Sequence, residues 1–139
     1  MSDPAADFWD AIRTGDVNSA MELVSDDVTI NLLPAKVNGG KEEARGFFAA
    51  TVMAFPDLLL TTKNHFTGTD GTAVTEMKME GTQAADYLGV VNQEKHIDLD
   101  QVWMLGTSDG RITSIRGFWD QNILYRRLAV KRLDAVSII

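Results

Sequence analysis

The residue best placed for chemistry is Asp120, which directly follows Phe118 and Trp119. A carboxylate beside aromatic side chains is poorly hydrated, and this environment suits a general acid or base. If one strand runs through this segment, Arg116, Phe118 and Asp120 share a face, because side chains alternate along a strand. Arg116 could then stabilise a developing enolate. The alternative is that Asp120 caps a following helix and that Arg116 only pairs with it.

A second group of candidates could form the wall of a binding pocket. Alternation places Gln101 and Trp103 on one face of a strand that is otherwise apolar. Trp103 offers a flat surface for aromatic rings, although ordinary core packing explains it as well. A buried Gln101 needs a hydrogen-bond partner, which a ligand or water could supply. Further residues expected to shape the pocket are Phe8, Phe48, Phe55 and Phe118. Asn31 could point into the pocket and bind a substrate oxygen, and a surface position fits its pattern equally well.

The two histidines are weaker candidates. His96, Asp98 and Asp100 form a row with the spacing of one strand face, which could hold a metal ion. Exposed polar residues on a half-buried strand give the same pattern, and no other set of ligands supports a metal, so we expect none. His65 lies in a β-rich segment, and we expect it to be packed or on the surface rather than a base.

The composition limits the classes of function. The chain has 139 residues and a net charge of -7, which argues against nucleic acid and against an anionic membrane surface as partners. It has no cysteine, which excludes disulfides and thiolate catalysis. There is no signal-peptide pattern and no apolar run long enough to span a bilayer, so we expect a soluble cytoplasmic protein.

Helical signals fill the first third of the chain, and strand signals follow. The expected helices run from Pro4 to Gly15, from Asp16 to Val24 and from Lys41 to about Phe55. The expected strands cover residues 28–33, 58–67, 73–81, 95–105 and 111–119, and turns that contain glycine separate several of them. Residues 120–133 are expected to form a final helix or an irregular tail.

This order of elements predicts a single α+β domain over residues 1–139. One long helix cannot cover a flat sheet of this size. We therefore expect a cone-shaped α+β barrel, in which the N-terminal helices pack in the concave face of a strongly curved, mainly antiparallel sheet. Such a sheet would enclose a hydrophobic pocket. An outer face that carries Val102 and Met104 favours a homodimer through the sheets.

Four stretches of the chain also match a known family in their order and spacing. They are Thr14-Gly15-Asp16 with Asp26-Asp27-Val28, then Ala54-Phe55-Pro56-Asp57-Leu58, then Glu80-Gly81-Thr82 with Tyr87-Leu88-Gly89-Val90, and finally Ser108-Asp109-Gly110-Arg111-Ile112 with Phe118-Trp119-Asp120-Gln121. In these stretches the chain resembles the SnoaL-like polyketide cyclases of the nuclear-transport-factor-2-like superfamily. The resemblance implies a curved α+β barrel that is commonly dimeric.

The resemblance also implies an activity. It is that of a cofactor-independent acid/base enzyme that closes a ring in an aromatic polyketide or similar apolar ketone by aldol condensation. The aspartate that the family uses on its last strand maps to Asp120. A histidine that many cyclases carry on the preceding strand maps to Trp103, which can donate a hydrogen bond but cannot shuttle a proton.

Other activities stay open. Relatives in anthracycline pathways imply hydroxylation of an aromatic polyketide as one alternative, and a non-catalytic ligand-binding or assembly domain is another. The scaffold also hosts ketosteroid isomerase-like and epoxide hydrolase activities. The latter would need a second carboxylate facing Asp120, and the strand pattern puts Asp98 and Asp100 on the other face.

Overall fold

The computed structural model describes residues 3–130, which form one six-stranded sheet and the helices that pack on it. The helices are α1 (Pro4–Arg13), α2 (Val17–Glu22), the 3-10 helix η1 (Leu33–Ala35), α3 (Lys41–Ala54) and α4 (Gln121–Arg127). The strands are β1 (Val24–Leu32), β2 (Val37–Gly39), β3 (Leu59–Thr67), β4 (Thr72–Thr82), β5 (His96–Ser108) and β6 (Arg111–Phe118). The part of the predicted final helix that falls on residues 131–133 lies outside the described residues.

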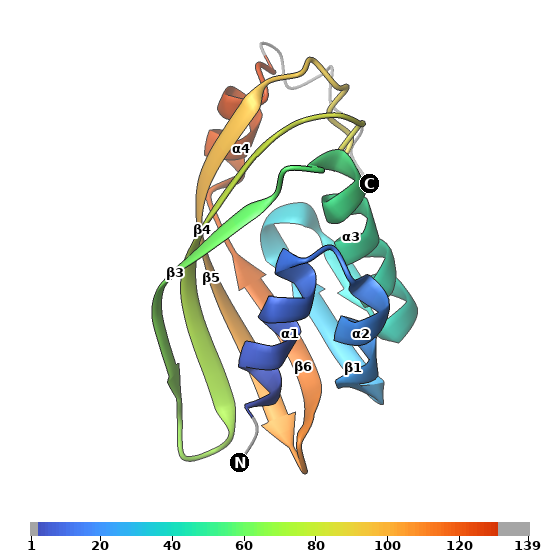
Figure 1. Cartoon of the computed structure of the whole chain (residues 1–139), viewed down its shortest axis with the longest axis vertical. Helices are drawn as coiled ribbons and strands as arrows, with labels where there is room; N and C mark the ends of the chain where they lie inside the picture. Colours follow the sequence, from blue (N-terminus) through green and yellow to red (C-terminus); the bar gives the residue numbers. More distant parts are fainter. Residues whose placement is uncertain (1–2, 131–139) are drawn as a thin grey trace.

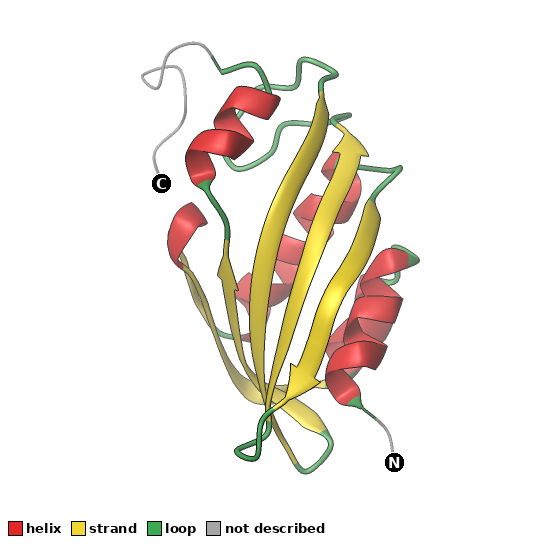
Figure 2. Ribbon diagram, turned by 90° about the vertical axis from the view of Figure 1, so that its left-hand side faces the viewer, coloured by secondary structure: helices red, strands yellow, loops and turns green. Residues whose placement is uncertain are grey.

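The sheet is strongly curved and has the order β2-β1-β6-β5-β4-β3. Every neighbouring pair is antiparallel except β1 and β6, which run parallel. Helices α1, α2 and α3 lie on the concave side, and α4 lies at one end of the sheet (Figure 1). The same curvature is visible in Figure 2, where the long strands bend around the helices. The predicted α+β fold with helices inside a curved, mainly antiparallel sheet is confirmed, and the sheet is an open cone because its edge strands β2 and β3 do not pair.

The alternating sequence of β4 explains which face is buried. Ala73, Thr75, Met77 and Met79 point into the concave side and are buried, whereas the residues between them are only half-buried. β5 pairs with β4 along the whole length of β4, so that Met77 lies opposite Gln101. The concave faces of the two central strands therefore follow the period of two that the sequence predicts.

The first strand is longer than expected. The sequence predicts a start at Val28, but β1 begins at Val24. The register between β1 and β6 shifts between Val24 and Thr29, which marks an irregularity at the exposed Asp26 and Asp27. This shift interrupts the alternation, so the first residues of the strand carry no periodic signal.

Polar contacts at both ends of α1 join it to the edge strand β3. At the start of α1, the Asp3 carboxylate accepts hydrogen bonds from the backbone of Ala5 and Ala6 and lies 2.9 Å from Nε2 of His65. At the end of α1, Nε of Arg13 donates to the backbone oxygen of Leu60 at 3.0 Å. These contacts hold α1 against β3, and His65 is an exposed residue that pairs with Asp3. Among residues 3–130, no helix is long and apolar enough to cross a membrane.

A single glycine makes room for the largest side chain of the core. Trp103 on β5 is almost fully buried, and its partner in register on β6 is Gly117. A Cβ atom at Gly117 would lie 2.7 Å from Cζ3 of the Trp103 ring, which is closer than non-bonded atoms approach. Gly117 is therefore required by packing and not by a turn.

We expect Gly117→Ala to lower the free energy of unfolding by about 1–3 kcal/mol, because the added methyl group collides with a ring that cannot move aside. Urea unfolding followed by fluorescence measures this change. Gly46→Ala is the matched control, since Gly46 is exposed on α3 with nothing within 4 Å of the added atom. The control should gain up to about 1 kcal/mol from helix propensity. Equal stability of Gly117→Ala and the wild type would contradict the packing role.

Candidate functional site

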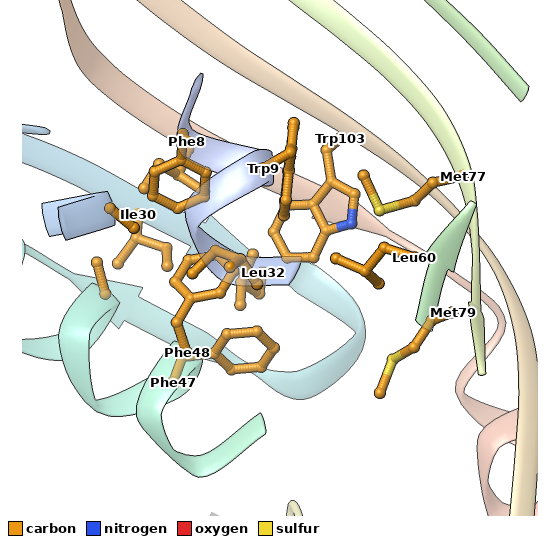
Figure 3. Close-up of a cluster of buried hydrophobic side chains, with 14 of the residues drawn as sticks. Phe8, Trp9, Ile30, Leu32, Phe47, Phe48, Leu60, Met77, Met79 and Trp103 are labelled. Carbon is orange, nitrogen blue, oxygen red and sulfur yellow. The ribbon is translucent and has the colours of Figure 1, made fainter. Parts of the chain in front are cut away.

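The concave side of the sheet holds a small cavity between α1, α3 and the central strands. Its volume is about 20 Å³, which is room for roughly one water molecule. The interior is therefore nearly filled by its own side chains (Figure 3). The residues that line the cavity are Trp9, Ile12, Phe47, Phe48, Thr51, Leu58, Leu60, Met79, Tyr87, Gln101 and Trp103.

Five of the eleven residues that line the cavity are aromatic. The ring centre of Trp103 lies 5.1 Å from that of Trp9 and 5.7 Å from that of Phe48. Trp119, just after β6, extends the cluster, because its ring stacks on Phe47 at 6.2 Å and lies 5.8 Å from Trp103. Edge-to-face and offset pairs at these distances are favourable, so the wall is a well-packed aromatic cluster.

The polar groups of the wall are neutral. Nε1 of Trp103 donates to Oε1 of Gln101 at 3.0 Å, so the partner of Gln101 is the indole two residues along its own strand. The hydroxyl groups of Thr51 and Tyr87 lie 2.9 Å apart. Burial raises the pKa of the Tyr87 phenol, and the hydrogen bond with Thr51 offsets only part of this increase. Tyr87 therefore stays protonated at neutral pH.

Around the cavity, the described residues include no acid, no base and no histidine. One donor in the wall is also unsatisfied, because Nε1 of Trp9 is enclosed without a hydrogen-bond partner among residues 3–130. The arrangement can stack on a flat ring and donate hydrogen bonds, but the lining itself offers no group that exchanges a proton near neutral pH.

The structure brings several of the predicted pocket residues together. Trp103, Gln101 and Phe48 line the cavity. Phe8 and Phe55 are buried one layer behind the wall, where Phe8 packs 5.1 Å from both Trp9 and Phe48, and Phe55 packs 5.1 Å from Tyr87. These two residues support the wall without forming it.

Three other predicted site residues lie on the outer face of the sheet. The side-chain position of Gly117 faces Trp103 in the interior, so its neighbours Arg116 and Phe118 face outward. The Arg116 guanidinium lies 6.0 Å from the centre of the Phe118 ring. Asn31 pairs in register with Arg116 and is exposed. The expectation that these side chains face the pocket is wrong, because the strand phase set by Gly117 turns them to the other side.

Asp120 occupies the N-cap of α4. β6 ends at Phe118, and Oδ1 of Asp120 accepts hydrogen bonds from the backbone of Asn122 at 2.9 Å and Ile123 at 3.3 Å. The side chain is exposed and is not part of the cavity wall. The expectation that one strand runs through Asp120 is wrong, and the alternative of a helix cap is confirmed. Within residues 3–130, no ion pair joins Asp120 to Arg116.

The row of His96, Asp98 and Asp100 lies on the outer face and takes part in ion pairs. Asp100 lies 2.9 Å from Nζ of Lys63, and Asp98 lies 3.3 Å from Nζ of Lys78. The hydrogen bond from Lys63 lowers the pKa of Asp100. The row therefore forms part of a charged, solvated surface.

Sequence reasoning left several wall residues unassigned. Trp9 and Phe47 belong to the apolar stripes of α1 and α3, and helical periodicity marks such residues as buried without separating wall from core. Tyr87 lies in the loop between β4 and β5, where no periodic signal exists. The loop is held by hydrogen bonds such as that from the backbone N–H of Ala84 to the oxygen of Ala54, at 2.7 Å.

Three solved structures are among those similar to this chain. AclR, a proposed hydroxylase from Streptomyces galilaeus, is 17% identical with a TM-score of 0.79, and the match covers 91% of this chain and 78% of AclR. A proposed SnoaL-like polyketide cyclase from a Jannaschia species is 20% identical with a TM-score of 0.80, over 93% and 91% of the two chains. IdmH, a proposed polyketide cyclase from Streptomyces antibioticus, is 24% identical with a TM-score of 0.76, over 92% and 97%. These likenesses show the fold.

No curated protein sequence matches the chain significantly. The sequence profile of the SnoaL-like polyketide cyclases, however, matches residues 4–128, which include every helix and strand described above. The chain therefore belongs to the SnoaL-like polyketide cyclase family.

Proposed function

We propose that this protein is a SnoaL-like enzyme that binds an aromatic polyketide or similar apolar ketone between α1, α3 and the sheet and promotes its ring closure. The observation that carries the proposal is the cavity wall, which is aromatic and uncharged. Flat rings of a ligand can stack on such a wall, and the absence of charge favours an apolar ligand.

Binding must enlarge the cavity, because about 20 Å³ is far less than a fused-ring ligand occupies. Met77 and Met79 lie on the sheet side of the interior (Figure 3), and methionine side chains adapt through three rotatable bonds. On the opposite side, α1 is joined to β3 by polar contacts at its ends. The ligand would replace contacts among the wall residues with contacts to itself.

We expect anthraquinone, a fused-ring ketone, to quench the intrinsic fluorescence of the protein. The three tryptophans of the chain, Trp9, Trp103 and Trp119, all belong to the interior cluster, so the signal reports on this site. Phe47→Leu should weaken binding by roughly 3- to 10-fold, which corresponds to the loss of one aromatic pair. Phe66→Leu is the matched control, because Phe66 is exposed at the edge strand and should bind as the wild type. Equal affinities of the two variants would contradict binding in the interior.

The role of Asp120 decides between catalysis and binding alone. On the acid/base proposal, Asp120 acts from the rim, one residue after Trp119, and its second carboxylate oxygen is free of the capping bonds. Binding without catalysis is the second candidate function. The observation that favours it is that Asp120 is exposed and that the cavity wall has no acid or base.

Two variants of Asp120 distinguish its role as the N-cap of α4 from its proposed role as an acid/base group. Asp120→Asn keeps a good N-cap, so the free energy of unfolding should stay within about 0.5 kcal/mol of the wild type, whereas Asp120→Ala should lose about 0.5–2 kcal/mol. Both variants should still bind anthraquinone. If Asp120 is the acid/base group, Asp120→Asn abolishes ring closure of a poly-β-ketone substrate, and full turnover in that variant would leave only the capping role.

Hydroxylation is a further candidate reaction, because the resemblance maps the histidine that many cyclases carry to Trp103. A proton shuttle at that position is excluded by the chemistry of indole. Oxygen uptake with a reduced aromatic substrate would distinguish hydroxylation from ring closure, which needs no oxidant.

We also propose that two copies of the chain associate through the outer faces of their sheets. This face carries an apolar patch that is partly exposed, formed by Phe66, Val74, Val102, Met104 and Phe118. The nearby Lys63, Lys78, Asp98 and Asp100 include both signs of charge, which suits the self-complementary interface of a two-fold dimer. Such an association would cover this apolar patch.

We expect Val102→Glu to shift the protein from dimer to monomer, since it places a charge in the middle of this patch. Sedimentation velocity measures the mass. Val91→Glu is the control, because Val91 is exposed in the loop between β4 and β5, away from the sheet face, and should not change the mass. A wild-type protein that sediments as a monomer would contradict the proposed dimer.

A further inference from the structure

We propose that the cavity selects ligands that present a hydrogen-bond acceptor, such as a carbonyl oxygen, and that Trp103 enforces this selection by orienting the amide of Gln101. The inference rests on the proposed function, because it concerns the same cavity, and it adds the chemical feature that the wall recognises. It follows from which hydrogen-bond donors and acceptors of the wall are already paired.

Gln101 is the first free donor. An indole can only donate a hydrogen bond, so Trp103 Nε1 must face the oxygen of the Gln101 amide, from which it lies 3.0 Å away. The amide nitrogen of Gln101 therefore points the other way. Its one partner among residues 3–130 is the thioether sulfur of Met79 at 3.5 Å, which is a weak acceptor. The Gln101 N–H groups are thus nearly unpaired within a buried wall.

Trp9 is the second free donor. Its ring lines the cavity from α1, it is 3% exposed, and its Nε1 has no hydrogen-bond partner among residues 3–130. A buried N–H without a partner is costly, and a carbonyl oxygen that accepts from it would remove that cost. An apolar ligand of the same shape would leave both Trp9 and Gln101 unpaired.

The two hydroxyl groups of the wall are already paired with each other. The Thr51 hydroxyl donates its single hydrogen to the backbone oxygen of Phe47 at 2.9 Å. The Tyr87 hydroxyl must then be the donor in its 2.9 Å contact with Thr51. This short chain ends on the backbone and leaves no free O–H group. The unpaired polar groups of the wall are therefore the N–H donors of Gln101 and Trp9.

Trp103 is a positioning residue in this scheme. If its N–H were absent, the Gln101 amide could turn over and offer its oxygen to the cavity instead of its nitrogen. The wall would then accept a ligand that donates a hydrogen bond. The residue at position 103 thus determines whether Gln101 offers its N–H groups or its oxygen to the cavity. Trp103 itself need not bond to the ligand.

Three bicyclic ligands of nearly equal size test the selection. They are 1-indanone, which only accepts, indole, which only donates, and indane, which does neither. By isothermal titration calorimetry, the wild type should bind 1-indanone about tenfold more tightly than indane, as expected for one well-made hydrogen bond. Gln101→Leu and Trp9→Phe should each reduce this ratio several-fold. Trp103→Phe should raise the affinity for indole relative to 1-indanone several-fold.

Phe47→Leu serves as the matched control, because it removes packing surface from the wall without changing its donors. It should weaken all three ligands and leave their ratios unchanged. Ratios between ligands do not depend on how much of a variant is folded, so a destabilised variant still gives a result.

Equal binding of 1-indanone and indane by the wild type would overturn the selection while leaving the apolar binding site in place. Failure of all three to bind would overturn the proposed binding function together with the selection. An unchanged indole-to-indanone ratio in Trp103→Phe would overturn its positioning role.

Discussion

The contact between Trp103 and Gly117 is the constraint on which much of the interior depends. The indole ring lies directly over the strand position opposite, and only a residue without a side chain leaves room for it. This contact sets the phase of β6. Residues on either side of Gly117 point outward, Trp119 points inward to join the aromatic cluster, and Asp120 falls beyond the strand at the start of α4. One bulky side chain thus determines which of the later residues can reach the cavity.

The same tryptophan also organises the polar groups of the interior. Its buried N–H is paired, because Gln101 provides the acceptor. All side chains around the cavity are neutral in the described chain, so the charged groups of this acidic protein remain at the surface, where the acids of the β5 row pair with lysines. An interior of this kind favours recognition by stacking and hydrogen bonding, and any proton transfer would have to come from the rim or from the ligand itself.

Membership of the SnoaL-like polyketide cyclase family identifies the scaffold, whereas the geometry of the site shows what the interior of this chain can bind. The family match and the similar structures establish a curved-sheet scaffold, and the names of those relatives include both cyclase and hydroxylase. The side chains of this chain modify that scaffold. With Trp103 on β5 and Gly117 opposite it, the volume and polarity of the interior are set by aromatic packing.

The sequence by itself determined the fold class, because alternation in β4 and β5 and the apolar stripe of α3 are local signals that survive in the folded chain. It also identified Trp103, Gln101 and Phe48, since each stands on the apolar face of a periodic element. It could not place Asp120, Arg116, Phe118 or Asn31, because their orientation depends on where β6 ends and on its phase relative to β5. It marked Tyr87 only as part of a stretch that resembles the family and did not assign it to the wall, because this residue lies in a loop without periodicity. Only the tertiary structure decided these positions, because the packing of Trp103 against Gly117 joins residues that are distant along the chain.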